Sequence, residues 1–330
     1  MKKNYLLMCL CLLAGSFAGC SDDDNGPTWK ELYDKEQAAI KDFMKDKSPK
    51  DSIILGTSIN GVKINPVAYV FNYSEDANKK KPKDGQFILV NYTDRNLGGS
   101  ILDDTRSSVI GGEKIELPKY PMGGPVYEEI IDDKDIFSIF FKYFSEGTSG
   151  SIILPSVLNF STTYLYREYK VEKVIEGSLL DYEYELIDKY LEKKGFDKKK
   201  LIQIPAIEEN DTITQIVKLI EKPSGDEILV SDSVTVYGSG YILDEIMDKE
   251  NLTNRKLFED EEATWKVSGL IQGMKDALLK MKVGEKACIL IPSGRGYGKG
   301  ILNYYYQYVF PPYATLAYEI EIKSKKANDK

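Results

Sequence analysis

Large aromatic and apolar side chains recur in a series of short motifs in the C-terminal part of the chain. In order, the motifs are 234–238 (VTVYG), 242–244 (ILD), 270–274 (LIQGM), 281–285 (MKVGE), 291–298 (IPSGRGYG) and 310–319 (FPPYATLAYE). Tyrosine, phenylalanine, leucine and methionine supply most of their large side chains. These residue types predict a small apolar cup with a few hydrogen-bond donors, rather than a charged reaction centre.

The 330-residue chain contains no histidine. This removes the usual general base near neutral pH and the commonest metal ligand. Histidine-dependent catalytic triads and His-ligated metal sites are therefore excluded. Cys288 lies in the apolar run 287–291, where a thiolate has no cationic neighbour, so we expect a buried strand residue rather than a nucleophile.

The ordered motifs resemble the FKBP family of peptidyl-prolyl isomerases. The resemblance implies a proline-binding pocket, with no cofactor and no metal. The residues that it assigns to catalysis are Tyr237, Asp244, Ile271, Tyr297, Phe310 and Tyr318. The residues that it assigns to substrate binding are Leu243, Leu270 and Met274.

The resemblance also implies roles for these residues. Tyr297 would offer its hydroxyl to a substrate carbonyl, the backbone N–H of Ile271 would be a second donor, and Asp244 would orient the twisted carbonyl. The family usually has tryptophan at the floor position of Met274 and phenylalanine at that of Leu243. Both departures predict a looser pocket, with weaker activity or an altered sequence preference.

Such a pocket suits rotation about an X-Pro bond, which faces a barrier of about 18–20 kcal/mol because resonance flattens the amide. No covalent step is needed to lower this barrier. A catalyst can bind the twisted bond better than the planar one and move the prolyl group into an apolar, water-poor site.

Simpler interpretations apply to single motifs. Each aromatic residue taken alone is typical of a plain core, and Asp244 alone is typical of a turn or cap. The segment 294–298 (GRGYG) is glycine-rich, but it lacks the Gly-Lys-Ser/Thr ending of a phosphate loop and no helical pattern follows it. The charged segment 245–264 is interpreted as an insertion that covers or extends the groove.

An internal repeat relates the two halves of the chain. Segments 87–93, 99–103, 144–147 and 152–156 parallel 233–238, 240–244, 281–284 and 289–293. Gly284 follows Gly147 at the same spacing at which Pro292 follows Pro155. The first copy keeps Tyr92 and the parallel aspartate Asp103 but loses the other pocket residues, so we interpret it as a degenerate partner for binding or spacing.

Local patterns predict the elements that position the motifs. Polar helices are expected over 29–47, ended by Ser48-Pro49, and over 179–194, ended by Gly195. Ile271, Met274, Leu278 and Met281 are three or four residues apart, as on one helical face. Residues 316–323 alternate between apolar and polar, which predicts a strand with one buried and one wet face.

The N-terminus is typical of an export signal. Lys2 and Lys3 precede an apolar run, and 16–20 (SFAGC) resembles a bacterial lipoprotein signal with lipid attached at Cys20. The acidic stretch 21–24 is similar to tags that send some Bacteroidota lipoproteins to the cell surface. Because Cys9 and Cys11 leave with the signal, no intramolecular disulfide is expected.

We therefore predict an α+β fold with two FKBP-like domains, each an antiparallel sheet wrapped around a short helix, with an extra helix before each. The expected organisation is a lipoprotein signal peptide (1–19), a tether (20–28), a degenerate FKBP-like domain with its leading helix (29–176), a helical linker (177–211), an isomerase domain (212–324) and a charged tail (325–330).

The predicted function is peptidyl-prolyl isomerisation of proline-containing polypeptides in the cell envelope, with a lipid anchor in the outer membrane. The alternative is a non-catalytic FKBP-like chaperone or binding lipoprotein for extended polypeptides or surface ligands. A net charge of -8 argues against nucleic acid as a partner. The sequence does not indicate an oligomeric state.

Overall fold

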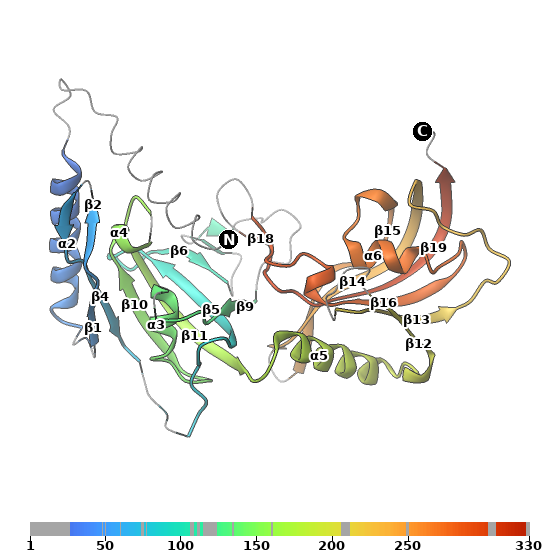
Figure 1. Cartoon of the computed structure of the whole chain (residues 1–330), viewed down its shortest axis with the longest axis horizontal. Helices are drawn as coiled ribbons and strands as arrows, with labels where there is room; N and C mark the ends of the chain where they lie inside the picture. The colour runs from blue at the N-terminus through green and yellow to red at the C-terminus, as the bar shows by residue number, and fades with distance from the viewer. Residues whose placement is uncertain are drawn as a thin grey trace. The chain divides into compact units, whose positions relative to one another are not determined.

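The computed structural model describes residues 27–47, 49, 51–59, 61–73, 76, 78–105, 109–110, 113–114, 124–133, 135–159, 161–205, 212–248, 251–302 and 308–327. The expected signal peptide, Cys20 and the end of the charged tail lie outside these ranges. The chain divides into two compact units (Figure 1), of which the first comprises residues up to 115 and 128–174, and the second comprises 116–127 and 175–330.

The first unit contains three helices and most of a seven-stranded antiparallel sheet. The helices are α2 (Trp29–Met44), α3 (Ile136–Phe141) and α4 (Ser156–Asn159). The sheet strands are β1 (Asp51–Ile54), β4 (Val67–Phe71), β5 (Phe87–Arg95), β6 (Ile101–Asp104), β9 (Val126–Glu129), β10 (Ser149–Leu154) and β11 (Leu165–Ile175). Two small hairpins are formed by β2 (Thr57–Ile59) with β3 (Val62–Ile64) and by β7 (Val109–Ile110) with β8 (Glu113–Lys114).

The second unit contains a six-stranded antiparallel sheet. Its strands are β12 (Leu201–Ile204), β13 (Thr214–Ile220), β14 (Asp232–Asp248), β15 (Asn251–Lys266), β16 (Lys286–Ile291) and β19 (Leu316–Ala327), and β17 (Ile301–Leu302) pairs separately with β18 (Tyr308–Phe310). The helices are α5 (Leu179–Lys194) and α6 (Gln272–Leu278), with 3-10 turns η1 (Lys198–Lys200), η2 (Val267–Gly269) and η3 (Ser293–Arg295). Figure 1 shows α5 and α6 on opposite faces of this sheet.

The two sheets have the same strand order. The first follows β1-β4-β10-β11-β5-β6 and the second follows β12-β13-β16-β19-β14-β15. A leading helix precedes each sheet, and a short helix, α3 or α6, precedes its third strand. The predicted α+β class and the predicted repeat of a helix followed by a wrapped sheet are therefore both seen in the structure.

Local sequence explains the leading helices. Thr28 caps α2 by accepting the N–H of Glu31 at 3.3 Å, while Glu31 accepts the N–H of Thr28 at 2.7 Å. Ser178 caps α5 by accepting the N–H of Asp181 at 3.0 Å. Gly195 ends α5 in the left-handed conformation with φ 67°, as predicted from the sequence.

The described part of the expected helical linker 177–211, residues 177–205, belongs to the second unit rather than forming a separate segment. Strand β12 pairs with β13 in the second sheet, and α5 packs on β14. The buried side chains of α5 recur three or four residues apart along one face, and they include Tyr182, Leu186, Ile187, Tyr190 and Leu191. An amphipathic helix of this kind gains its stability by burying that face, so α5 belongs to the second unit.

Both faces of β19 are covered near its start, whereas Lys323 further along the strand is exposed. Leu316, Tyr318, Ile320 and Ile322 are buried in the core under α6, as the alternation predicts. The expectation that the other face is wet is wrong near Ala317, which is fully buried. Helix α5 covers that face, where the Tyr190 hydroxyl donates to Glu319 at 2.6 Å.

Among the residues that the structure describes, none of the helices combines the length and apolar character needed to cross a bilayer.

Candidate functional site

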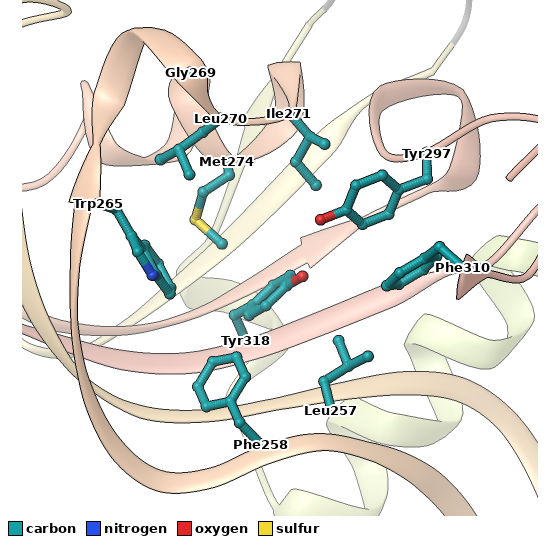
Figure 2. Close-up of a pocket in the computed structure, with 10 residues that line it drawn as sticks. All are labelled: Leu257, Phe258, Trp265, Gly269, Leu270, Ile271, Met274, Tyr297, Phe310 and Tyr318. Carbon is teal, nitrogen blue, oxygen red and sulfur yellow. The ribbon is translucent and has the colours of Figure 1, made fainter. Parts of the chain in front are cut away.

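An apolar pocket of about 350 Å³ opens on the α6 face of the second sheet (Figure 2). It is lined by Leu257, Phe258, Trp265, Gly269, Leu270, Ile271, Met274, Tyr297, Phe310 and Tyr318. Five of these ten residues are aromatic, and the tyrosine hydroxyls are among the few polar side-chain groups of the pocket. A site of this composition can enclose a proline ring and exclude water from the amide bond beside it.

Each part of the wall comes from a different element. Leu270 and Ile271 lie immediately before α6, and Met274 projects from its first turn. Tyr318 lies on the central strand β19, and Phe310 ends β18. Tyr318, on the α6 face of the sheet, therefore forms the floor, while the segment before α6 and the segments after β16 supply the rim.

Six of the nine residues assigned from the sequence meet in this pocket. They are Leu270, Ile271, Met274, Tyr297, Phe310 and Tyr318. The other three, Tyr237, Leu243 and Asp244, lie outside it. Tyr237 is 39% exposed and its ring lies under the Lys323 ammonium at 5.5 Å, on the sheet face opposite the core.

Leu243 is buried on the α5 side of the sheet. Its neighbour Ile242 pairs with Leu316, and both belong to the core under α6. Successive strand residues point to opposite faces, so Leu243 points away from that core. Tyr241, two residues earlier, packs its ring on Tyr190 of α5 with ring centroids 6.3 Å apart.

Asp244 is 3% exposed and forms an ion pair with the guanidinium of Arg255. Arg255 also donates to the carbonyl of Pro125 at 3.1 Å. Burial raises the pKa of the Asp244 carboxyl, and the Arg255 charge opposes this shift. The expected role of Asp244 in orienting the substrate carbonyl therefore has no support in this arrangement.

Four pocket residues were not predicted, namely Leu257, Phe258, Trp265 and Gly269. The first three lie on β15, which pairs with β14 from Ser233↔Lys266 to Asp248↔Asn251. The segment 245–264, interpreted from the sequence as an insertion, is thus part of a long hairpin that forms one pocket wall. The sequence signal for this wall was the spacing of Leu257, Phe258 and Trp265. The acidic run 259–262 between these residues made it hard to recognise.

Phe258 and Trp265 of β15 supply the aromatic rings that the sequence comparison found missing at Met274 and Leu243. The ring of Trp265 meets the edge of Tyr318 with centroids 6.4 Å apart, and Phe258 packs on Tyr318 at 6.0 Å. An indole and a phenyl ring therefore line the pocket even though Met274 and Leu243 occupy the expected aromatic positions. The walls are more aromatic than the sequence predicted.

Gly240 leaves room for this aromatic cluster. A Cβ atom at this position would lie 2.6 Å from the Phe258 ring and 2.9 Å from the Tyr318 ring. Gly240 pairs with Tyr318 in the β14–β19 register, so the two rings lie over its backbone.

The two tyrosine hydroxyls interact inside the pocket. Tyr318 is 6% exposed and hydrogen-bonds to Tyr297, whose hydroxyl points toward the middle of the lining side chains (Figure 2). Burial raises the pKa of both phenols, so both stay protonated at neutral pH. With Tyr318 as donor, Tyr297 keeps its own proton for a ligand oxygen.

The turn that carries Tyr297 is fixed at several points. Gly298 donates to the carbonyl of Ser293 at 2.9 Å, and the Gly298 carbonyl accepts from Tyr313 at 2.6 Å. The ring of Tyr297 packs on Phe310 with centroids 4.0 Å apart. The Arg295–Asp276 ion pair links η3 to α6. These contacts hold the hydroxyl in place before any ligand binds.

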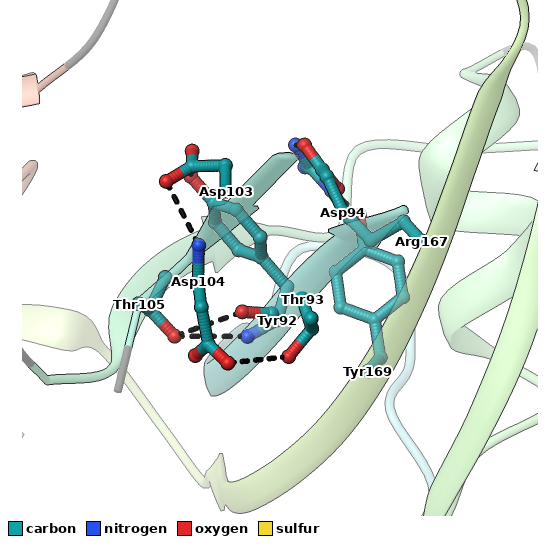
Figure 3. Close-up of polar contacts among 8 residues, drawn as sticks. All are labelled: Tyr92, Thr93, Asp94, Asp103, Asp104, Thr105, Arg167 and Tyr169. Atoms are coloured by element: carbon teal, nitrogen blue, oxygen red, sulfur yellow. Dashed lines mark hydrogen bonds and ion pairs between the residues drawn. The ribbon is translucent and has the colours of Figure 1, made fainter. Parts of the chain in front are cut away.

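The first unit places polar side chains where the second has its pocket floor (Figure 3). Ile152 pairs with Arg167 in the register in which Ile289, its counterpart in the repeat, pairs with Tyr318. Arg167 therefore takes the position of Tyr318. Its guanidinium lies 3.8 Å from the centre of the Tyr92 ring and binds Asp94 through two nitrogens, one at 2.7 Å.

One part of the proposed repeat alignment is wrong. Asp103 lies on β6 and pairs with Asp94 across the hairpin, whereas Asp244 lies on β14, before the hairpin turn. The two aspartates are therefore not equivalent. Asp103 accepts a hydrogen bond from the Tyr92 hydroxyl at 3.3 Å, and burial raises its pKa.

The described residues contain no cluster of three or more His, Cys, Asp or Glu side chains that could hold a metal ion.

Comparisons with solved structures give distant similarities. The peptidyl-prolyl cis-trans isomerase from Pseudomonas syringae pv. tomato str. DC3000 is 18% identical, with 45% of this chain and 93% of that chain covered and a TM-score of 0.34. FkpA from Escherichia coli is 20% identical, with 45% and 61% covered and a TM-score of 0.32. The three FKBP domains of wheat FKBP73 are 16% identical, with 79% and 95% covered and a TM-score of 0.26.

A comparison with curated proteins gave no match. The family model of the FKBP-type peptidyl-prolyl cis-trans isomerase matches residues 225–323, the segment that contains the whole pocket. This C-terminal segment of the chain is therefore similar to the FKBP-type peptidyl-prolyl cis-trans isomerase family.

Proposed function

We propose that the second unit catalyses rotation about X-Pro bonds in polypeptides. The observation that carries the proposal is the preformed aromatic pocket with a protonated tyrosine hydroxyl at its centre. A prolyl ring held among Trp265, Phe258 and Phe310 leaves its amide in an apolar site, where the twisted, less conjugated bond is favoured over the planar one.

Two hydrogen bonds would stabilise the twisted state in this scheme. The Tyr297 hydroxyl donates to a substrate carbonyl, and the backbone N–H of Ile271 at the pocket rim is the second donor. Phenol and amide donors in a dry site are stronger than in water, because no solvent competes for the carbonyl. No group in this scheme changes its protonation state.

A proline-peptide isomerisation assay on the full chain tests the proposal. Tyr297→Phe should lower kcat/KM by about tenfold, because it removes one donor while keeping the ring. Phe310→Ala should lower it by a similar or larger factor, because it opens the wall. Tyr237→Phe, on the opposite sheet face, is the matched control and should be neutral. No acceleration by the wild type, or equal activity in all four proteins, contradicts the proposal.

A second candidate is a non-catalytic module that holds extended polypeptides. The displacement of Asp244 into an ion pair with Arg255 favours it, because the pocket then has no carboxylate to orient a substrate. The chain has two tryptophans, and Trp29→Phe leaves Trp265, in the pocket, as the single tryptophan for selective excitation. Fluorescence changes on adding proline peptides, without accelerated isomerisation, would select this candidate.

We also propose that the protein acts in the cell envelope, anchored in the outer membrane by lipid on Cys20. The lipoprotein-like signal supports the anchor, and the acidic stretch 21–24 supports an outward-facing position. Labelled fatty acid should enter the wild type and not Cys20→Ala. Protease added to intact cells should remove the protein if it faces outward.

A further inference from the structure

Glu183 is a buried carboxylate outside the matched family segment. It lies on α5, on the face that packs against the second sheet, and is 2% exposed. One of its oxygens, Oε1, accepts the backbone N–H of Ser293 at 2.6 Å and the hydroxyl of Thr315 at 3.1 Å. Both donors are buried, so no water competes for these hydrogen bonds.

Both donors begin segments that carry pocket tyrosines. Ser293 starts η3, and its carbonyl accepts the N–H of Gly296 at 3.0 Å and of Gly298 at 2.9 Å, so the turn holding Tyr297 is built on it. Thr315 immediately precedes β19, which carries Tyr318. A single carboxylate thus joins the starts of the two segments whose hydroxyls meet in the pocket.

We propose that Glu183 is a positioning residue for isomerisation, which fixes the Tyr297 turn against the start of β19 from the far side of the sheet. The inference rests on the proposed isomerase function and extends it to a helix before the family domain. Hydrogen bonds to a carboxylate are shorter and stronger than those between neutral groups, so this contact restrains the turn more than a neutral side chain can.

The first unit contains the same contact without the pocket. Glu36 of α2 accepts the N–H of Ser156 at 2.7 Å and the Ser156 hydroxyl at 2.5 Å, and Ser156 is the counterpart of Ser293 in the repeat. In that copy Arg167 replaces the floor tyrosine. The helix-to-turn contact is therefore part of the repeated unit, and only in the second copy does it support pocket tyrosines.

Burial raises the pKa of Glu183 to about 7, with the hydrogen bonds from Ser293 and Thr315 opposing the shift. The Tyr127 phenol, which interacts with this carboxyl, has its pKa raised by burial and stays protonated over the same range. Ionisation of Glu183 near neutral pH converts a neutral acceptor into a charged one and strengthens both hydrogen bonds.

The test measures kcat/KM on a proline peptide with the full chain, from pH 6 to 8. Glu183→Ala should lower kcat/KM by about tenfold, mainly through kcat, because the hydroxyls lose their spacing. Glu183→Gln keeps a neutral acceptor and should recover most of the activity. Wild-type activity should rise through pH 7, and the Gln variant should show no such rise. Glu36→Ala is the matched control and should keep wild-type activity.

Amide hydrogen exchange of 293–300 provides a readout that does not need turnover. Faster exchange of this segment in Glu183→Ala, with the core of β16 unchanged, supports the contact. Unchanged activity and exchange in Glu183→Ala overturn the proposal, as does a pH rise that persists in Glu183→Gln. If Glu183→Ala does not fold, the pH profile of Glu183→Gln decides. An inactive wild type overturns the isomerase function, and exchange still decides whether Glu183 restrains the turn.

Discussion

At the scale of single residues, the pocket depends on a position that has no side chain. Gly240 lies beneath the rings of Phe258 and Tyr318, with no room for even a methyl group. Displacing rings that are held by dense packing lowers the free energy of unfolding, and overpacking of this kind typically costs about 1–3 kcal/mol. The pocket shape is therefore encoded partly in the backbone of β14.

Gly240→Ala should disturb the pocket more than the fold. The added methyl displaces the Phe258 and Tyr318 rings, so KM for a proline peptide should rise and kcat/KM should fall by about tenfold. Isomerase kinetics and thermal unfolding check both parts. Gly56→Ala is the control, since its Cβ would lie 3.4 Å from the nearest atom, in the first unit. Unchanged kinetics in Gly240→Ala would contradict this account of the wall.

Ionisation of Glu183 has opposite effects on the stability of the fold and on the hydrogen bonds that position the Tyr297 turn. Its pKa is about 7 in the folded chain, above the value of 4.5 for an unperturbed glutamate. The folded state therefore binds more protons than the unfolded state between these values, and stability falls as pH rises through that window. The ionised form that strengthens the hydrogen bonds is also the form that burial disfavours.

Replacing Glu183 by glutamine should remove this pH dependence. From pH 4 to pH 8, the unfolding free energy of the wild type should fall relative to Glu183→Gln by an amount on the order of 3 kcal/mol. Denaturant unfolding at several pH values measures the difference. Glu185→Gln, exposed on the same helix, should follow the wild type. Parallel curves for wild type and Glu183→Gln would show that Glu183 does not carry the dependence.

Residues assigned from the motifs line the pocket where the motif also places their side chains on the α6 side of the sheet. Tyr297, Phe310 and Tyr318 sit in regular motifs whose neighbours fix their direction. Tyr237 lies outside the pocket because Val236 is buried in the core, so the next residue along the strand faces the other side of the sheet. That alternation was visible in the sequence, and it would have excluded Tyr237.

At the scale of elements, local signals predicted the helices better than the strands. Helix α5 begins and ends where its serine cap and Gly195 place it, because capping depends on neighbouring residues alone. The hairpin of β14 and β15 depends on pairing between distant residues, and its exposed charged face hid the alternation. Its role as a pocket wall is a tertiary property that local patterns do not contain.

We expect helix α5 to be necessary for the stability of the second unit. A chain of residues 212–330 lacks α5 and β12, which leaves Leu243 and Ala317 uncovered and removes the acceptor of the Ser293 N–H. We expect its Tm to be lower than that of residues 177–330 by about 10 °C or more, or the shorter chain not to fold. Circular dichroism during heating measures this. Equal Tm values would show that α5 does not contribute to the stability of the second unit.

At the scale of the whole molecule, a single architecture occurs twice with two different interiors. Both sheets share strand order, leading helix and the glutamate–serine contact, yet one floor position holds Tyr318 and the other Arg167. The Asp94 and Arg167 side chains are 15% and 17% exposed, so the first interior holds a largely desolvated ion pair. A proline ring has no apolar surface to bind at that point.

Breaking this ion pair should affect the stability of the first unit and leave catalysis intact. Arg167→Leu leaves the Asp94 carboxylate unpaired, which should lower the unfolding free energy of the first unit by about 2–4 kcal/mol. Arg95→Leu, which breaks a more exposed pair with Glu168, should cost about 1 kcal/mol or less. Calorimetry and the isomerase assay measure both effects. Lost activity in Arg167→Leu would give the first unit a catalytic part.

The last strand of each unit is inserted between earlier ones, β11 between β10 and β5, and β19 between β16 and β14. The hydrogen-bond partners of Glu183 on α5, Ser293 and Thr315, lie 110 and 132 residues further along the chain. A chain that is synthesised or threaded N-terminus first therefore cannot close either sheet until the closing strand has emerged. Such non-local closure slows folding, so each half remains open and extended during its own synthesis.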